Sequence, residues 1–198
     1  MNLISTLAIA MGASWVSGIN LYAAVATLGL LGRFADLRLP GELDVLTSWW
    51  IIGIASVLYI IEFFADKVPY LDSTWDAIHT FIRIPAGAVL AATAFGEFDR
   101  SVQVVAFLLG GGLALSAHGT KASARAAINL SPEPVSNIVV SLAEDFIAFS
   151  TILLSVFLPL VTIIFLVTFL ALSIYIAPRM VRVMRGAISR VRGVFGYS

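Results

Sequence analysis

The stretch Glu62–Arg83, EFFADKVPYLDSTWDAIHTFIR, decides the fold class predicted for this chain. It carries one glutamate, three aspartates, a lysine, a histidine and an arginine between segments that are otherwise apolar. A second stretch, Pro134–Ile152, contains an adjacent acidic pair, Glu144 and Asp145, within an apolar run. Charged side chains inside a membrane segment are costly and are therefore usually functional. Together the two stretches predict a polytopic membrane protein with a polar centre.

The composition favours a membrane protein as well. Mean hydropathy is +0.98, and only 12% of the 198 residues are charged, against about a quarter in soluble domains. The length leaves room for about six crossings at about 20 residues each, and no polar block remains for a soluble domain. The formal net charge is zero, which gives no argument for a nucleic-acid partner. The absence of cysteine excludes disulfides and thiol chemistry.

The hydropathy pattern predicts an all-α membrane helix bundle of about six transmembrane helices over residues 1–178. The helices are expected to begin near residues 3, 48, 72, 101, 134 and 159. Residues 179–198 carry five arginines opposite an apolar face, which is typical of a basic amphipathic helix on a membrane surface. By the positive-inside rule this tail lies in the cytoplasm, and six crossings then place both termini there.

The two halves of the bundle suggest an internal repeat. Residues 1–95 and 101–178 each open with a helix striped with small residues, continue with a helix bearing Glu and Asp, and end on a more apolar helix. Three crossings per unit would invert the second unit relative to the first, as in many transporters. In the first helix, Gly18 beside Asn20 marks either a packing stripe or an unwound point.

Charged residues recur at helical spacing and indicate which side chains share a face. We predict a substrate or ion site formed by Asn20, Glu62, Asp66, Asp72, Asp76, His79, Glu144 and Asp145. Its predicted charge partners are Lys67, Arg83, His118, Lys121 and Arg125. Because Glu144 and Asp145 point about 100° apart on a helix, we expect one to face Glu62 and Asp66 across a wet cavity. The other is expected to pair with a basic side chain.

The sequence leaves the ligand of this site open. Carboxylates are the hard oxygen ligands that divalent cations prefer, so Glu62, Asp66, Glu144 and Asp145 are candidate ligands of Ca²⁺, Mg²⁺ or Mn²⁺. The same groups can instead take up and release a proton, since burial favours the neutral form. A third alternative is an anionic substrate bound by the basic side chains. No other cofactor is predicted.

Four stretches resemble a known family. They are GINLYA (Gly18–Ala23), EFFADKVPYLDSTWDAIHTFIRIPAGA (Glu62–Ala88), SPEPVSN (Ser131–Asn137) and SLAEDF (Ser141–Phe146), and they resemble the bacterial inner-membrane family called domain of unknown function 4126. This resemblance implies a multi-pass protein of the inner membrane and implies no activity. A more distant resemblance is to cation/proton exchangers with a Glu-x-Gly-Asp-Lys/Arg motif. Glu62–Lys67 departs from that motif by one extra residue and a missing glycine.

We therefore predict a small secondary transporter or channel for a small ion or solute. One alternative is a structural or accessory subunit, whose buried charges would only set the helix register. A less favoured alternative is a membrane enzyme acting on lipid phosphates, for which His79 and His118 are the only histidines and no HExxH or GxSxG motif appears. The expected partners are the lipid bilayer and the small ion or solute. A homo-oligomer is left open, and no nucleic acid is expected.

Overall fold

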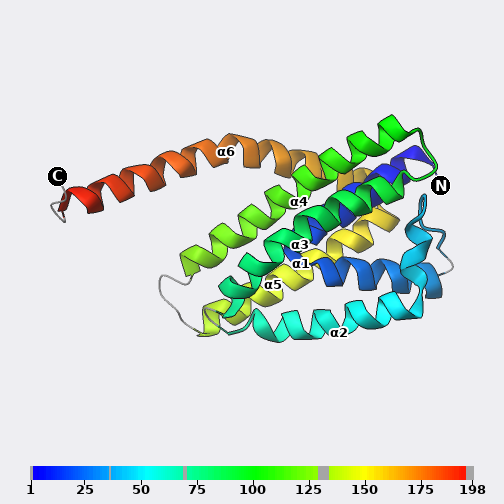
Figure 1. Ribbon diagram of the computed structural model, residues 1–198, viewed down its shortest axis with the longest axis horizontal. Helices are drawn as coiled ribbons and strands as arrows, with labels where there is room; N and C mark the ends of the chain where they lie inside the picture. Colours follow the sequence, from blue (N-terminus) through cyan, green and yellow to red (C-terminus); the bar gives the residue numbers. More distant parts are fainter. Residues whose placement is uncertain (1, 36, 69–70, 129–133, 195–198) are drawn as a thin grey trace.

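The computed structural model describes residues 2–35, 37–68, 71–128 and 134–194, with side chains described for all of them except 73, 134 and 177–194. Within these ranges the protein is a bundle of helices without strands (Figure 1). The elements are α1 (Leu3–Phe34), the 3₁₀-helix η1 (Leu43–Thr47), α2 (Trp49–Ala65), α3 (Leu71–Ala94), α4 (Arg100–Ile128), α5 (Pro134–Phe157) and α6 (Pro159–Val194). The predicted all-α bundle is confirmed, and each helix begins within one residue of its predicted start.

Local sequence explains where several helices begin. The Asn2 side chain accepts a hydrogen bond from the Ser5 amide at 2.8 Å and caps α1. Pro134 and Pro159 are the first residues of α5 and α6, where a proline costs no helical hydrogen bond. Five of the described helices are long and apolar enough to cross a membrane, and α2 is a shorter apolar helix of 17 residues. The chain is therefore a multi-pass membrane protein.

Helix α1 is broken at Asn20. This residue has φ −150° and ψ 96°, which is extended backbone between two helical halves. Its side-chain oxygen accepts a hydrogen bond from the Ala23 amide at 2.9 Å, as an N-cap residue does, so Asn20 caps the second half. Both alternatives raised for this stretch are present, because Asn20 is the unwound point while Gly18 remains helical and packs closely against α4.

The first half of α1 runs antiparallel to α3. The hydroxyl of Ser14 donates to the carbonyl oxygen of Gly87 at 2.8 Å. One turn later along α1, the hydroxyl of Ser17 donates to the carbonyl oxygen of Arg83 at 2.7 Å. Residue numbers rise along α1 as they fall along α3. The first half of α1 therefore begins beside the C-terminal end of α3 and runs towards the middle of that helix.

The second half of α1 turns back towards its own starting end. Gly29 lies against η1, where an added Cβ would be only 2.5 Å from the carbonyl oxygen of Leu46. Just before η1, the amide of Glu42 donates to the carbonyl oxygen of Thr93 at 3.0 Å, next to the last residue of α3. Both ends of α1 therefore lie at the same end of the bundle, and Figure 1 shows the helix folded back on itself.

The return of α1 sets the direction of the remaining helices. We call the end of the bundle that holds both ends of α1 the near end, and the opposite end the far end. Helices α2, α4 and α6 run from the near end to the far end, and α3 and α5 run back (Figure 1). The prediction of two termini on one side assumed a single crossing by α1, and this assumption is wrong. The start of α1 and the end of α6 lie at opposite ends of the bundle.

We expect cysteines at the two ends of the chain to be labelled from opposite sides of the membrane. The chain has no native cysteine, so Leu3→Cys, Phe34→Cys and Ser198→Cys each report a single position. A membrane-impermeant maleimide applied to spheroplasts and to inverted vesicles measures the side. Leu3→Cys and Phe34→Cys should react from one side and Ser198→Cys from the other. Reaction of Leu3→Cys and Ser198→Cys from the same side would contradict the returning α1.

The two predicted repeats pack differently. Helix α1 packs extensively against α2 and α3, whereas α4 packs against α3 and α1 and only lightly against α5 and α6. Helix α4 also has no counterpart of the break in α1. The inverted repeat over residues 1–95 and 101–178 therefore stays a prediction. The amphipathic character of residues 179–198 also stays a prediction. The backbone of α6 is helical to Val194, but the side chains on which that character rests lie outside the described residues.

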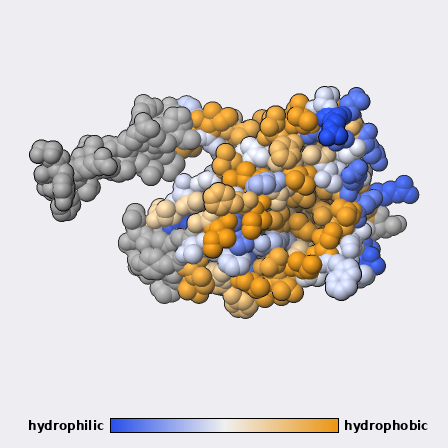
Figure 2. All heavy atoms as spheres, in the orientation of Figure 1, coloured by the Kyte–Doolittle hydropathy of each residue, from blue (hydrophilic) through white to orange (hydrophobic). Residues whose placement is uncertain are grey.

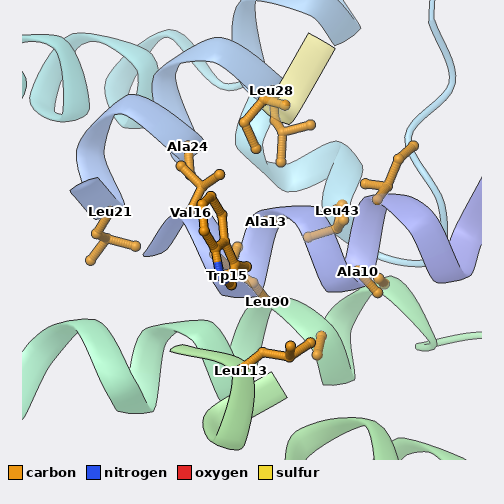
Figure 3. Close-up of a cluster of buried hydrophobic side chains, with 14 of the residues drawn as sticks. Ala10, Ala13, Trp15, Val16, Leu21, Ala24, Leu28, Leu43, Leu90 and Leu113 are labelled. Atoms are coloured by element: carbon orange, nitrogen blue, oxygen red, sulfur yellow. The ribbon is translucent and has the colours of Figure 1, made fainter. Parts of the chain in front are cut away.

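Small and apolar side chains form the interior around α1. Ala10, Ala13, Val16, Ala24 and Leu28 of the two halves lie in one buried cluster, which Leu90 of α3 and Leu113 of α4 complete (Figure 3). Large apolar side chains cover much of the face seen in Figure 2, and hydrophilic residues gather at its right-hand, near end. This distribution suits lipid, where helices associate through close contact of small residues.

Two tryptophan side chains are exposed at the start of α2. Trp49 and Trp50 are 54% and 82% exposed at the near end. The guanidinium of Arg33 lies 4.5 Å from the ring centroid of Trp49 and also donates to the carbonyl oxygen of Thr47. Tryptophan and arginine are suited to the headgroup level, because each combines an apolar body with a polar tip.

Candidate functional site

Polar stripes on four helices meet in the far half of the bundle, beside the break in α1. The side chains are Glu62 of α2, Asp66 and Lys67 just beyond it, Asp72, Asp76, His79 and Arg83 of α3, His118, Lys121 and Arg125 of α4, and Asn137, Ser141, Glu144 and Asp145 of α5. Spacings of three or four residues place each stripe on one helix face. We call the ten charged members, Glu62, Asp66, Lys67, Asp72, Asp76, Arg83, Lys121, Arg125, Glu144 and Asp145, the charged network.

Arg83 joins α2 to α3. Its side chain is fully buried, and its two terminal nitrogens donate to Glu62 Oε1 at 2.7 Å and to Asp76 Oδ1 at 2.6 Å. Asp76 lies two turns before Arg83 on the same helix, whereas Glu62 comes from the neighbouring one. A guanidinium offers several donors in a fixed plane, so a single side chain can hold both carboxylates.

Lys121 lies at the centre of the network. Its ammonium group is 2.9 Å from Asp66 Oδ2, 3.4 Å from Asp76 Oδ1, 3.6 Å from Glu144 Oε2 and 4.0 Å from Glu62 Oε1. These carboxylates come from α2, from the turn after α2, from α3 and from α5. The single ammonium group of Lys121, on α4, therefore lies within ion-pair distance of carboxylates from all four segments. The side chain is only 2% exposed, and each of these contacts therefore takes place away from bulk water.

Arg125 joins α4 to α5 near the far end. It donates to both oxygens of Glu144, from Nε at 3.2 Å and from Nη2 at 2.6 Å, which is the two-pronged geometry expected of an arginine–carboxylate pair. Its Nη1 donates to the Asn137 side-chain oxygen at 2.6 Å and to the backbone carbonyl of Asp66 at 3.0 Å. The same nitrogen is 3.6 Å from Asp72 Oδ2.

The break in α1 supplies backbone oxygens to the network. The carbonyl of Ile19 accepts a hydrogen bond from the ammonium of Lys121 at 3.1 Å, and the carbonyl of Gly18 lies 3.3 Å from His118 Nδ1. These carbonyls end the first half-helix, where the helix dipole is negative and attracts cations. Broken backbone at membrane depth is tolerated where protein groups satisfy it, and here α4 supplies them. We call Gly18–Ala23 the tip of α1.

Asp145 differs from the other carboxylates. Its Oδ1 accepts a hydrogen bond from Asn20 Nδ2 at 3.4 Å, and its Oδ2 has no partner among the described residues. The nearby Lys67 donates instead to the carbonyl of Phe63 at 2.9 Å and to the Ser141 hydroxyl at 3.3 Å. Burial lowers the pKa of Lys67 from its usual range, against the opposing effect of the carboxylate of Asp145.

Both histidines use their two ring nitrogens inside the protein. His79 Nδ1 is 2.8 Å from the carbonyl oxygen of Trp75, and Nε2 is 3.1 Å from the Tyr22 hydroxyl. A carbonyl only accepts, so Nδ1 carries the proton and Nε2 of the neutral ring accepts from tyrosine. His118 Nε2 contacts the Thr80 hydroxyl at 2.7 Å. These contacts indicate that the histidines position α1, α3 and α4.

The charged network contains two more carboxylates than basic side chains. The carboxylates are Glu62, Asp66, Asp72, Asp76, Glu144 and Asp145, and the bases are Lys67, Arg83, Lys121 and Arg125. Four carboxylate oxygens are buried with no hydrogen-bond partner among the described residues: Glu62 Oε2, Asp66 Oδ1, Asp76 Oδ2 and Asp145 Oδ2. An unpaired charged side chain in a membrane costs about 2.5–3.5 kcal/mol on insertion scales. The excess therefore needs a proton or a bound cation.

The structure brings all thirteen predicted site residues into this region. The expected division of the acidic pair is present in part, because Glu144 pairs with Arg125 while Asp145 faces the tip of α1. The wet cavity expected between the two acidic pairs stays a prediction, and two other openings lie elsewhere among the described residues. The larger opening, about 490 Å³, lies between α1 and α5 near Phe34. The other, about 310 Å³, is an apolar space between α1, α3, α4 and α6.

The described side chains do not converge as metal ligands do. No group of three or more carboxylates or imidazoles within the described ranges is arranged to hold a metal ion. The carboxylates named above as candidate ligands, Glu62, Asp66, Glu144 and Asp145, alternate in space with basic groups. A divalent cation at these four positions stays a prediction, and it would require the ion pairs to rearrange.

The site residues predicted from the sequence leave out several uncharged groups of the site. Tyr22 and Thr80 hold the histidines, Asn137 holds Arg125, and the carbonyls of Gly18 and Ile19 hold α4. Asn137 and Ser141 lie at helical spacing before Glu144, which is a signal in the sequence. The carbonyl oxygens give no such signal, because every residue has one and only the break in α1 frees them.

These features define an α-helical, multi-pass membrane protein with a buried, charge-unbalanced network beside a broken helix. A family model described as domain of unknown function (DUF4126) matches residues 7–179. The chain therefore belongs to this family, as the sequence predicted. No curated protein and no solved structure matches the chain. The distant resemblance to cation/proton exchangers stays a prediction.

Proposed function

We propose that the protein is a small secondary transporter for a small ion or solute and that the charged network is its central site. The observation that carries the proposal is the excess of carboxylates, with four buried oxygens that lack a partner among the described residues. A network that served stability alone would be expected to balance its charges, because a buried charge without a partner destabilises the protein. An unbalanced network responds to the arrival or departure of a cation or proton.

The break in α1 supports the same function. Transporters commonly place their sites where a discontinuous helix offers the ends of two half-helices to the substrate or coupling ion. In this chain the Ile19 carbonyl, which ends the first half, contacts Lys121, and Asn20, which caps the second half, contacts Asp145. Any change in the charge of the network therefore acts directly on the tip of α1.

The orientation follows from the basic residues. Lys67, Lys121 and Arg125 lie in the far half of the bundle, and the five arginines of residues 179–198 belong to the last part of α6, on that side. Arg33, Arg38 and Arg100 lie at the near end. The positive-inside rule then places the far end in the cytoplasm of a bacterium and the start of α1 outside. On this assignment the network lies in the cytoplasmic half of the inner membrane.

A second candidate function is that of an accessory subunit whose network only holds the helices together. The observation in its favour is that the basic side chains are fully engaged in ion pairs. Arg83, Lys121 and Arg125 each contact at least two carboxylates. The two candidates differ in what happens when a charge is removed without changing shape. A structural network loses only stability, whereas a transport site loses flux.

We expect Asp145→Asn to slow transport strongly while leaving the protein folded. Asp145 has no base within 4.0 Å among the described residues, so the substitution leaves no cation unpaired. Proteoliposomes that contain an internal pH dye are diluted into KCl, NaCl, MgCl₂ or sodium phosphate. At least one salt should change the internal pH faster than in empty liposomes. Asp145→Asn should slow this change at least about tenfold, which corresponds to about 1.4 kcal/mol of barrier.

The matched control is Asp99→Asn, which makes the same change at an exposed position of the near end. It should retain the wild-type rate. Thermal unfolding in detergent measures stability in parallel for both variants. Unchanged flux and unchanged stability in Asp145→Asn would contradict the proposed site. Absence of flux in the wild-type protein with all four salts would favour the accessory subunit.

A further inference from the structure

Asp145 is the member of the charged network best placed to change its protonation state. Glu62 and Asp76 contact Arg83, Asp66 contacts Lys121, and Glu144 contacts Arg125, all within 2.9 Å. Asp145 is 8% exposed, and no described basic group lies within 4.0 Å of it. A buried carboxylate without a cation is more stable with a proton, because desolvation disfavours the charged form.

We propose that Asp145 is the proton-binding site of this protein and that the tip of α1 responds to its protonation. The proposal deepens the proposed function, because the proton then becomes the coupling ion of the transporter. It rests on the proposed function only where it calls the proton a coupling ion. Proton binding at Asp145 and its effect on the tip are properties of the protein that can be measured without any transported solute.

The groups around Asp145 determine what each protonation state does. Four charged groups act on it: Lys67 and Asp66 in the turn after α2, Lys121 of α4 and Glu144 of α5. Tyr59 of α2 is a further titratable group that interacts electrostatically with Asp145, and α1 contributes the neutral Asn20. No described residue of α6 adds a charged group on this side. Among these groups Lys67 is a cation on a long side chain, and its ammonium group contacts Ser141, one turn before Asp145.

Two states follow from this arrangement. When protonated, Asp145 is neutral and keeps the hydrogen bond with Asn20, so the tip of α1 stays closed over the network. When ionised, the carboxylate needs a cation, and Lys67 reaches it by leaving the Ser141 hydroxyl. The weak 3.4 Å contact with Asn20 is then lost in favour of a charge-assisted pair, which is the stronger interaction. The tip of α1 loosens as a result.

Infrared difference spectroscopy of the purified protein tests the proton site directly. A protonated carboxyl group gives a carbonyl stretching band that disappears on ionisation. We expect such a band at mildly acidic pH and its loss as the pH rises. Asp145→Asn should remove the band, whereas Glu144→Gln and the exposed Asp99→Asn should keep it. A band that persists unchanged in Asp145→Asn, or the absence of any such band in the folded wild-type protein, would overturn the proposal.

A cysteine in the tip of α1 tests the response. Leu21 is 8% exposed, so Leu21→Cys should react slowly with a maleimide while the tip is closed. Dividing each rate by the rate for the protein unfolded in detergent corrects for the ionisation of the thiol. The corrected rate should rise at least about tenfold across the pH range in which the infrared band is lost, and this rise should vanish when Asp145→Asn is added. Asp145→Glu retains a titrating group and should restore the rise. A corrected rate that is independent of pH would overturn the response.

The two proposals fail separately. Suppose that the infrared band is lost as the pH rises and the tip of α1 responds to pH, but KCl, NaCl, MgCl₂ and phosphate do not move. This result would overturn transport and leave the proton site standing. Flux that depends on Glu144 but not on Asp145, with an unchanged infrared band in Asp145→Asn, would overturn the proton site and leave transport standing.

Discussion

Replacing Arg83 by methionine is expected to lower the free energy of unfolding by about 3–5 kcal/mol, the cost of breaking a buried ion pair from one side. The substitution removes the cation that holds Glu62 Oε1 at 2.7 Å and Asp76 Oδ1 at 2.6 Å, and all three side chains are at least 95% buried. Two carboxylates would then depend on Lys121 alone. Urea or thermal unfolding in detergent micelles measures the loss.

The control for this prediction is Arg100→Met, the same change at an exposed position at the start of α4. It should alter stability by less than about 0.5 kcal/mol, as surface substitutions usually do. A further variant removes the whole pair set by combining Arg83→Met with Glu62→Met and Asp76→Leu. It should recover most of the lost stability, because no charge is left without a partner. A loss below about 1 kcal/mol in Arg83→Met would show that the network relaxes around the missing cation.

Gly18→Ala is expected to cost about 3 kcal/mol, at the upper part of the range for overpacking. An added Cβ at Gly18 would lie 2.2 Å from the carbonyl oxygen of Ala114 and 2.9 Å from the Cβ of Ala117. One of these contacts is with backbone, which cannot move aside as a flexible side chain does. The tip of α1 would have to separate from α4, and the contact of Ile19 with Lys121 would lengthen.

Gly112→Ala on the outside of α4 is the matched control. No atom lies within 4 Å of a Cβ added there, and alanine is the better helix former by about 0.8–1.0 kcal/mol. This variant should therefore be as stable as the wild-type protein or more stable. Unfolding in detergent compares the two variants, and the infrared and cysteine measurements show whether Gly18→Ala also opens the tip. Equal stability of both variants would mean that α1 and α4 are not in contact at Gly18.

Periodicity in the sequence determined the helices and the membership of the site. A helix repeats every 3.6 residues whatever surrounds it, so the spacing of Asp72, Asp76, His79 and Arg83 was enough to place them on one face. The free-energy cost of charged side chains in lipid was enough to predict that the charged stripes on different helices come together. The same local signals predicted the pairing of one member of Glu144–Asp145 with a base, and they left a packing stripe and an unwound point as alternatives near Gly18 and Asn20.

The partners and the path of α1 were decided by the tertiary structure. Length and hydropathy describe Leu3–Phe34 as one crossing, because they register apolar character and not direction. The direction after the extended residue Asn20 depends on η1, on Thr93 and on the serine contacts with α3, which are distant in sequence. The choice between Glu144 and Asp145 likewise depends on the rotation of α5 against α4. A rotation of about 100° exchanges adjacent residues, and only packing against the neighbouring helices sets that angle.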